Sequence, residues 1–494
     1  MIGYLLEFRA LASAIPGTPM SFASPLFLWF FMPVTLLACW LLPPRHRNGV
    51  VAAASLFFYT WGAGPYTVLL LSAIAVNYGA GLALDSVRLR DRPCARRAVL
   101  VATVGWDVAI LAVWKYAGFA SRQIDALSGL LGLGDTPIVA LALPIGISFF
   151  TFHHLSYVVD VYRGSTPAQR SPVRFITYIT MFPQLVAGPI VRYHEIAAQL
   201  DDTRRDRFGG LAVGFPRFAL GLAKKVIVAD SLAPVVDAAF AHEGGQLTTA
   251  TAWLGALAYT LQIYFDFSGY SDMAIGLGMM VGFRLPENFN RPYSAYSITD
   301  FWRRWHMSLS RWFRDYVYIP LGGNRGGAPR TYRNLLIIFV LCGFWHGAEW
   351  TFLVWGLYHG GLLVAERLLG WDRPPRAVWA LALRRGTTLL LVVVGWVLFR
   401  SQSMAEAADM LQAMFTWRPG GLEEFAVNRQ RMLTFALALV VVALPASRAL
   451  GPLIESERGP AAWVARSALT WVAAPYAAML VAAGTFSPFL YYQF

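Results

Sequence analysis

The chain has 494 residues, of which 57% are hydrophobic and only 14% are charged, and its formal net charge is +13. Soluble globular domains carry about 25% charged residues, so this composition excludes an ordinary soluble fold. It predicts an all-α polytopic membrane protein with about eleven to thirteen membrane-embedded helices, some of them interfacial or re-entrant. Apolar segments of spanning length recur along the chain, at residues 22–42, 66–84, 98–117, 335–369, 387–399, 433–444 and 467–483.

The first nineteen residues differ in character from the rest of the chain. Residues 1–19 lack the basic start and apolar core of a signal peptide, and Met20 reads as a second natural start. We therefore expect 1–19 to be a dispensable extension and 20–494 to be a single transmembrane domain, with its chemistry in the block 262–360. The chain's three cysteines are far apart and unpatterned, and no metal site is predicted.

Basic residues collect in three early loops, at 45–47, 88–97 and 163–174, whereas the turns between them, at 62–65 and 121–137, carry little charge. Because basic loops stay on the cytoplasmic side, this alternation places the N-terminus in the periplasm. The surplus positive charge is also suited to an anionic donor such as coenzyme A or an acidic carrier protein.

His346 stands in an almost unbroken apolar run, between Gly343 and Gly347. Ionisable groups are costly inside a membrane segment, so they often mark a proton or substrate path. The flanking glycines would let a ligand or another helix approach closely. The alternative is a packing histidine. Asp266 and Asp272 stand in a comparable setting, among aromatic residues in a helical, apolar context.

Residues 300–315 have the spacing of one amphipathic helix, with Thr299 or Asp300 as its N-cap. His306 falls at the border of its two faces, from which a histidine could reach inward. One face carries Trp302, Trp305, Leu309, Trp312 and Phe313. The other carries Arg303, Arg304, Arg311 and Arg314. We expect these arginines to lie near lipid headgroups or the phosphates of a donor.

Two further segments combine polar residues or helix breakers with an apolar context. Residues 144–160 predict a helix that starts at a proline and contains His153 and His154, which point to different faces and so make poor paired metal ligands. Residues 181–190 are interrupted by two prolines and a glycine, which predicts a re-entrant or cavity-lining segment. The chain has no internal repeat that we can detect, which weakens a transporter interpretation.

A buried neutral histidine is suited to act as general base in acyl transfer from a thioester to a hydroxyl. At the residues that suggest this chemistry, the chain resembles the membrane-bound O-acyltransferase superfamily, in its bacterial alginate O-acetyltransferase-like branch. The resemblance spans residues 20–494 and rests on Ser24-Pro-Leu-Phe-Leu, Trp114-Lys-Tyr116, Leu143-Pro-Ile-Gly-Ile-Ser-Phe-Phe-Thr-Phe152, Tyr157-Val-Val-Asp-Val-Tyr-Arg163, Phe182-Pro-Gln-Leu-Val-Ala-Gly-Pro-Ile190, Tyr264-Phe-Asp-Phe-Ser-Gly-Tyr-Ser-Asp272, Phe301-Trp-Arg-Arg-Trp-His-Met-Ser-Leu-Ser310, Phe344-Trp-His-Gly347 and Phe489-Leu-Tyr-Tyr-Gln-Phe494.

The resemblance implies a ring of membrane helices around a thinned central cavity, with His346 as the essential histidine and His306 as a second polar residue. It implies acetyl transfer from a cytoplasmic thioester, acetyl-coenzyme A or an acyl-carrier protein, for O-acetylation of an exported alginate-like polysaccharide at the bacterial inner membrane. A periplasmic acetyltransferase partner and no permanently bound cofactor are expected. The alternatives are a D-alanyl transferase for teichoic acid, a peptidoglycan O-acetyltransferase and, from a different class, a transporter.

The orientation can be tested by placing single cysteines in the loops at 45–47, 88–97 and 163–174 and treating whole cells with a membrane-impermeant maleimide. We expect these three positions to stay unlabelled, because basic loops are retained in the cytoplasm. Cysteines in the turns at 62–65 and 121–137 are the matched controls and should be labelled. Strong labelling of any two basic loops would overturn the orientation.

Overall fold

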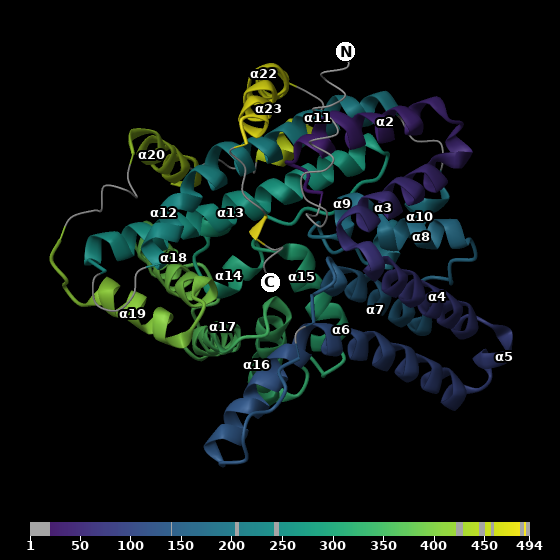
Figure 1. Ribbon diagram of the computed structural model, residues 1–494, viewed down its shortest axis with the longest axis horizontal. Helices are drawn as coiled ribbons and strands as arrows, with labels where there is room; N and C mark the ends of the chain where they lie inside the picture. The colour runs from purple at the N-terminus through teal and green to yellow at the C-terminus, as the bar shows by residue number, and fades with distance from the viewer. Residues whose placement is uncertain are drawn as a thin grey trace. The chain divides into compact units, whose positions relative to one another are not determined.

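A computed structural model of the protein describes residues 20–139, 141–202, 207–241, 247–420, 428–443, 450–455, 459–484 and 489–490 (Figure 1). The predicted extension 1–19 and the last four residues of the C-terminal motif lie outside these ranges. The described residues contain helices and loops and no β-strand, as the apolar composition predicts. Four helical runs among them are long and apolar enough to cross a membrane, namely Pro44–Leu84, Pro93–Leu130, Val378–Arg400 and Pro460–Ala482. The protein is thus an all-α multi-pass membrane protein, and the count of eleven to thirteen embedded helices stays a prediction.

The chain divides into two compact units, and the division falls inside helix α6 (Pro93–Leu130). Unit 1 comprises Met1–Val108, Ala142–Val186 and Tyr193–Arg204. Besides the first part of α6, its elements are η1 (Phe27–Phe31), α2 (Met32–Leu41), η2 (Pro44–His46), α3 (Arg47–Ala63), η3 (Gly64–Tyr66), α4 (Thr67–Leu84), α5 (Val87–Arg90), α7 (Ile147–Arg163), α8 (Pro172–Thr180), α9 (Phe182–Leu185) and α10 (Tyr193–Asp201).

In unit 1 the side chain of Arg96 brings three helix ends together. Its Nε donates to the carbonyl of Leu84 at 3.1 Å, and its Nη2 donates to the carbonyls of Val161 and Tyr162 at 3.3 and 2.7 Å. The end of α4, the start of α6 and the end of α7 therefore meet at one point. The second and third basic loops begin at these ends, so they emerge on the same side of the unit, as the charge alternation requires.

Unit 2 comprises Ala109–Leu141, Ala187–Arg192 and Arg205–Phe494. After the remainder of α6, its elements are α11 (Arg207–Ala223), η4 (Lys224–Ala229), α12 (Asp230–Phe240), α13 (Thr249–Met280), η5 (Pro292–Ser294), α14 (Ile298–Trp302), α15 (Met307–Phe313), η6 (Arg314–Tyr318), α16 (Gly327–His346), α17 (Trp350–Leu368), α18 (Val378–Arg400), α19 (Met404–Phe415), α20 (Arg429–Ala443), α21 (Leu450–Glu455), α22 (Pro460–Ala468), η7 (Leu469–Ala473) and α23 (Ala474–Ala482).

The long helix α13 packs along α11, and the two run side by side in Figure 1. Glycines permit this approach: a Cβ on Gly214 would lie 2.6 Å from the carbonyl oxygen of Gly276, and one on Gly276 would lie 2.6 Å from the backbone nitrogen of Phe218. Small residues at helix contacts are the usual means of close packing in membranes, where no hydrophobic force drives helices together.

The apolar run 335–369 is divided between α16 and α17, which are joined by residues 347–349 and pack against each other. The apolar segment given as one range from the sequence therefore contains two helices. Gly343 lies at the crossing, where its missing Cβ would meet the backbone of Phe352 and the Cα of Gly356. The expected close approach at Gly343 thus occurs, and a second helix is what approaches.

This contact predicts opposite outcomes for two Gly→Ala substitutions. Gly343→Ala forces α16 and α17 apart, and such overpacking costs roughly 1–3 kcal/mol of stability. Gly361→Ala on α17 is the control, because a Cβ there meets nothing within 4 Å. We expect thermal unfolding of the purified protein to shift to lower temperature for Gly343→Ala only. Equal unfolding temperatures for both variants would show that this contact is not close.

Candidate functional site

His346 is the last residue of α16 and is buried. Its Nδ1 lies 2.7 Å from the carbonyl oxygen of Cys342, one turn back. Because a carbonyl can only accept, Nδ1 carries the proton, and in the neutral ring Nε2 carries the lone pair. The ring packs edge-on against Trp345, Trp355 and Phe399, with centroids 4.8, 5.0 and 5.3 Å away. The carbonyl of Cys342 fixes the tautomer of the imidazole, and the three aromatic rings pack around it.

The segment that carries His306 differs from the prediction. The single helix expected over 300–315 is wrong, because α14 ends at Trp302 and α15 begins at Met307. The N-cap is Ser297, whose hydroxyl accepts from the backbone N–H of Asp300 at 3.0 Å. His306 occupies the break with φ of 44° and is fully buried rather than at the border of two faces. The predicted apolar face is buried, so the burial pattern is confirmed although the continuous helix is not.

A left-handed conformation is uncommon for a residue other than glycine and persists only where neighbouring contacts impose it. Here Asn288 imposes it: its Oδ1 accepts from the backbone N–H of Ser308 at 3.1 Å and lies 3.2 Å from Nδ1 of His306. Since this amide oxygen is an acceptor, His306 donates from Nδ1 and carries its lone pair on Nε2. Burial, with a smaller contribution from nearby His346, lowers the pKa of His306 well below its usual value, so the ring is neutral at physiological pH.

The two predicted histidines meet at one indole. The ring centroid of Trp345 is 4.8 Å from that of His346 and 6.0 Å from that of His306. His306 also meets Phe267 of α13 edge-on, with ring centroids 4.7 Å apart. The irregular segment that we expected to line a cavity also ends here, because the backbone N–H of Ile190 donates to the hydroxyl of Ser308 at 3.0 Å. The structure thus places two neutral imidazoles with the same tautomer in one aromatic setting.

Two buried residues of this region were not singled out from the sequence. His359 on α17 accepts a hydrogen bond from the indole N–H of Trp302 at its Nδ1, 3.3 Å away, so it has the opposite tautomer to His346. Lys115 of α6 donates to the backbone carbonyls of Trp345 and His346. The sequence could have indicated His359, because it is a histidine inside an apolar helix. For Lys115 the only indication was its place in the Trp114-Lys-Tyr116 motif.

The four predicted donor-binding arginines do not form one face. Arg304 pairs with Asp300 at 2.9 Å, and Arg311 donates to the backbone carbonyl of Glu287 at 3.1 Å, so both brace the local fold. Arg303 is exposed, and so is Arg314, which pairs with Asp315 at 2.7 Å. Of the four, Arg303 and Arg314 are therefore the ones whose charge can reach a bound molecule or a headgroup.

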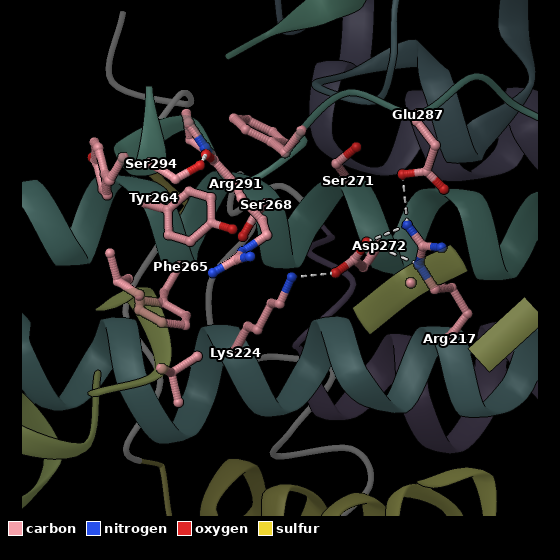
Figure 2. A pocket seen from close by; sticks show the side chains of 16 residues that line it. Arg217, Lys224, Tyr264, Phe265, Ser268, Ser271, Asp272, Glu287, Arg291 and Ser294 are labelled. Carbon is pink, nitrogen blue, oxygen red and sulfur yellow. Dashed lines mark hydrogen bonds and ion pairs between the residues drawn. The ribbon is translucent and has the colours of Figure 1, made fainter. Parts of the chain in front are cut away.

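Asp266 and Asp272, which stand in helical, apolar surroundings as their sequence context indicates, are both ion-paired. Asp272 binds Arg217 and Lys224 of the neighbouring helix, each at 2.6 Å, and Arg217 also reaches Glu287 at 2.8 Å (Figure 2). Asp266 pairs with Lys225 at 2.7 Å. Because an unpaired buried charge is costly, each of these carboxylates needs the partner that it has.

A cavity of about 180 Å³ opens beside this cluster, and Figure 2 shows Tyr264, Ser268 and Ser271 around it. Phe289 also lines it and packs against Phe267 at 5.0 Å. Phe267 in turn meets His306. The cavity is therefore separated from His306 by aromatic side chains.

Comparison with known proteins identifies the family. Residues 143–400, which include both histidines and all four arginines, match the model of MBOAT, the membrane-bound O-acyltransferase family. The chain is 41% identical to Probable alginate O-acetylase AlgI of Azotobacter vinelandii, over 96% of this chain and 100% of that protein. It is 44% identical to the protein of the same name from Pseudomonas aeruginosa, over 86% of this chain and 81% of the relative.

A third relative is the Peptidoglycan O-acetyltransferase of Helicobacter pylori, which is 35% identical over 80% of this chain and 79% of its own length. Two of these relatives are named as probable O-acetylases and the third as an O-acetyltransferase, and all three align over most of both chains. The chain therefore belongs to the membrane-bound O-acyltransferase family, in its alginate O-acetyltransferase-like branch.

Proposed function

We propose that this O-acyltransferase takes an acetyl group from a cytoplasmic thioester and passes it across the inner membrane for O-acetylation of an exported, alginate-like polysaccharide. Coenzyme A or an acidic acyl-carrier protein supplies the thioester, and a periplasmic acetyltransferase completes delivery to the polymer. The N-terminus lies in the periplasm. One observation carries the chemical part of this proposal: two buried histidines beside one indole have the same tautomer, with Nδ1 donating to a fixed oxygen.

This arrangement suits His346 to general base catalysis. Nε2 of His346 accepts the proton of the acceptor hydroxyl, whose oxygen then bonds to the acyl carbon. The bond between that carbon and the sulfur of the donor breaks, and the proton passes from the imidazole to the leaving thiolate, which becomes a thiol. His306 approaches from the cytoplasmic side and is placed to assist at the sulfur. The surrounding Trp345, Trp355 and Phe399 exclude water, which would otherwise hydrolyse the thioester.

The names of the relatives support the acceptor. Alginate O-acetylases match at 41% and 44% identity over most of the chain, whereas the peptidoglycan O-acetyltransferase matches at 35%. An alginate-like polymer is therefore the first choice and peptidoglycan the second. The donor side is supported by the basic residues between 284 and 333, where nine arginines stand against three acids. Such an excess of positive charge attracts the phosphates of coenzyme A or an acidic carrier protein.

The role of His346 is tested by His346→Ala, with His359→Ala as a matched control. Both residues are buried histidines in contact with Trp355, so the two variants lose comparable packing. Removing a general base costs about 10²–10⁴-fold in rate, so we expect His346→Ala to lose acetyl transfer while still inserting into the membrane. The measurement is the acetate content of the exported polymer, divided by the amount of each variant in the membrane. Near-normal acetylation by His346→Ala would leave the histidine a packing role.

The donor side is tested by reversing the two exposed charges in Arg303→Glu/Arg314→Glu. Charges remote from the reacting atoms contribute mostly uniform binding, so the KM for the thioester should rise more than kcat falls. Arg88→Glu/Arg90→Glu, on another exposed basic loop, controls for the overall charge of the protein. An unchanged KM in Arg303→Glu/Arg314→Glu would assign these arginines to the lipid surface.

A further inference from the structure

Helix α16 ends in apolar surroundings, at the residue on which the proposed chemistry depends. The last four carbonyl groups of any α-helix have no partner within the helix. A buried carbonyl without a partner is costly, so other donors must reach these four. In α16 these carbonyls belong to Gly343, Phe344, Trp345 and His346.

All four carbonyls are satisfied, and three of them by two consecutive residues of α6. The carbonyl of Gly343 accepts from the backbone N–H of Gly347 at 3.3 Å. That of Phe344 accepts from the hydroxyl of Tyr116 at 2.7 Å. Those of Trp345 and His346 accept from the ammonium group of Lys115, the latter at 3.4 Å. The donors lie about 230 positions before the helix end that they cap.

The position of Lys115 is unusual for a lysine. It is 9% exposed, and among the residues that the structure describes no carboxylate lies within ion-pairing distance of its ammonium group. Its side-chain nitrogen faces the carbonyl end of α16, where the helix dipole is negative, and lies 5.9 Å from the ring centroid of Trp345. A buried hydrogen-bond donor is thus directed at the turn that carries His346.

We propose that Lys115 and Tyr116 are positioning residues for acyl transfer, because they hold the last turn of α16 and thereby fix the tautomer and direction of His346. The inference rests on the proposed function. Nδ1 of His346 is bonded to the carbonyl of Cys342 within this same turn, so its orientation depends on the turn staying helical. When the turn frays, Nδ1 loses its acceptor and Nε2 no longer faces the reacting hydroxyl.

The chain offers a matched control on the same two segments. Arg122 of α6 pairs with Glu349, three residues beyond His346, at 2.5 Å, and both side chains are about half exposed. Exposed pairs contribute little to stability, and Arg122→Gln removes this contact without touching the carbonyls of α16. Lys115→Met keeps an unbranched side chain one atom shorter and removes the donors, Lys115→Arg keeps donors, and Tyr116→Phe deletes one hydroxyl.

The experiment uses the full chain in lipid nanodiscs together with the periplasmic acetyltransferase of the proposed function, with acetyl-coenzyme A as donor and a soluble oligomannuronate as acceptor. We expect Lys115→Met to lower kcat by about 10²-fold, the size expected when a reacting group is displaced by about 1 Å, while the donor KM stays within about twofold. Tyr116→Phe should show a smaller fall in kcat, Lys115→Arg a partial recovery, and Arg122→Gln no change. Hydrogen exchange of the peptide 340–349 should be faster in Lys115→Met and Tyr116→Phe than in the wild type and Arg122→Gln.

Two results would overturn the positioning role. One is a wild-type kcat in both Lys115→Met and Tyr116→Phe. The other is a fall in kcat that Arg122→Gln reproduces. If Lys115→Met does not fold, Tyr116→Phe decides alone, since a wild-type rate and unchanged exchange in that variant reject the cap. If the wild-type protein itself transfers no acetyl group, the proposed function fails, and the exchange experiment still decides whether Lys115 and Tyr116 hold the end of α16.

Discussion

The termination of α16 inside apolar surroundings is the constraint on which the rest of the site depends. A helix that ends among buried side chains must have its carbonyls satisfied by other parts of the protein. Lys115 and Tyr116 supply the donors, and the glycine contact between Gly343 and Gly356 brings α17 against the same turn. His346 stands at the end of that turn, so its position is determined by the contacts that make the helix end possible.

The position of His306 is also determined by contacts with other parts of the chain. Its left-handed backbone is imposed by Asn288, which accepts from the backbone of Ser308 and bonds the imidazole. Both histidines therefore have Nδ1 committed to an oxygen, while His359 has its proton on the other nitrogen. The tautomer therefore distinguishes His346 and His306, which are suited to accept a proton at Nε2, from His359, which has a packing role. Geometry, rather than burial alone, makes this distinction.

The sequence predicts the features that depend on local composition. Ionisable residues in apolar segments revealed His346, Asp266 and Asp272, and their burial is a direct consequence of the helices that carry them. Features that depend on distant partners were not predictable. The break at His306 arises from Asn288, eighteen residues away, so the local period of 300–315 suggested one helix. The partners of the buried aspartates, Arg217, Lys224 and Lys225, come from another helix. Lys115 acts on carbonyls about 230 positions later.

The measurement that tests the central claim most directly is a structure of the protein in nanodiscs with a non-transferable thioether analogue of acetyl-coenzyme A. The account predicts that the acyl carbon lies beside Trp345, with Nε2 of His346 facing a space that an acceptor hydroxyl could occupy at a hydrogen-bond distance of about 2.6–3.2 Å. It also predicts that Nδ1 of His346 still donates to the carbonyl of Cys342. An analogue bound away from Trp345, or a His346 ring turned so that Nε2 donates to the helix, would contradict it.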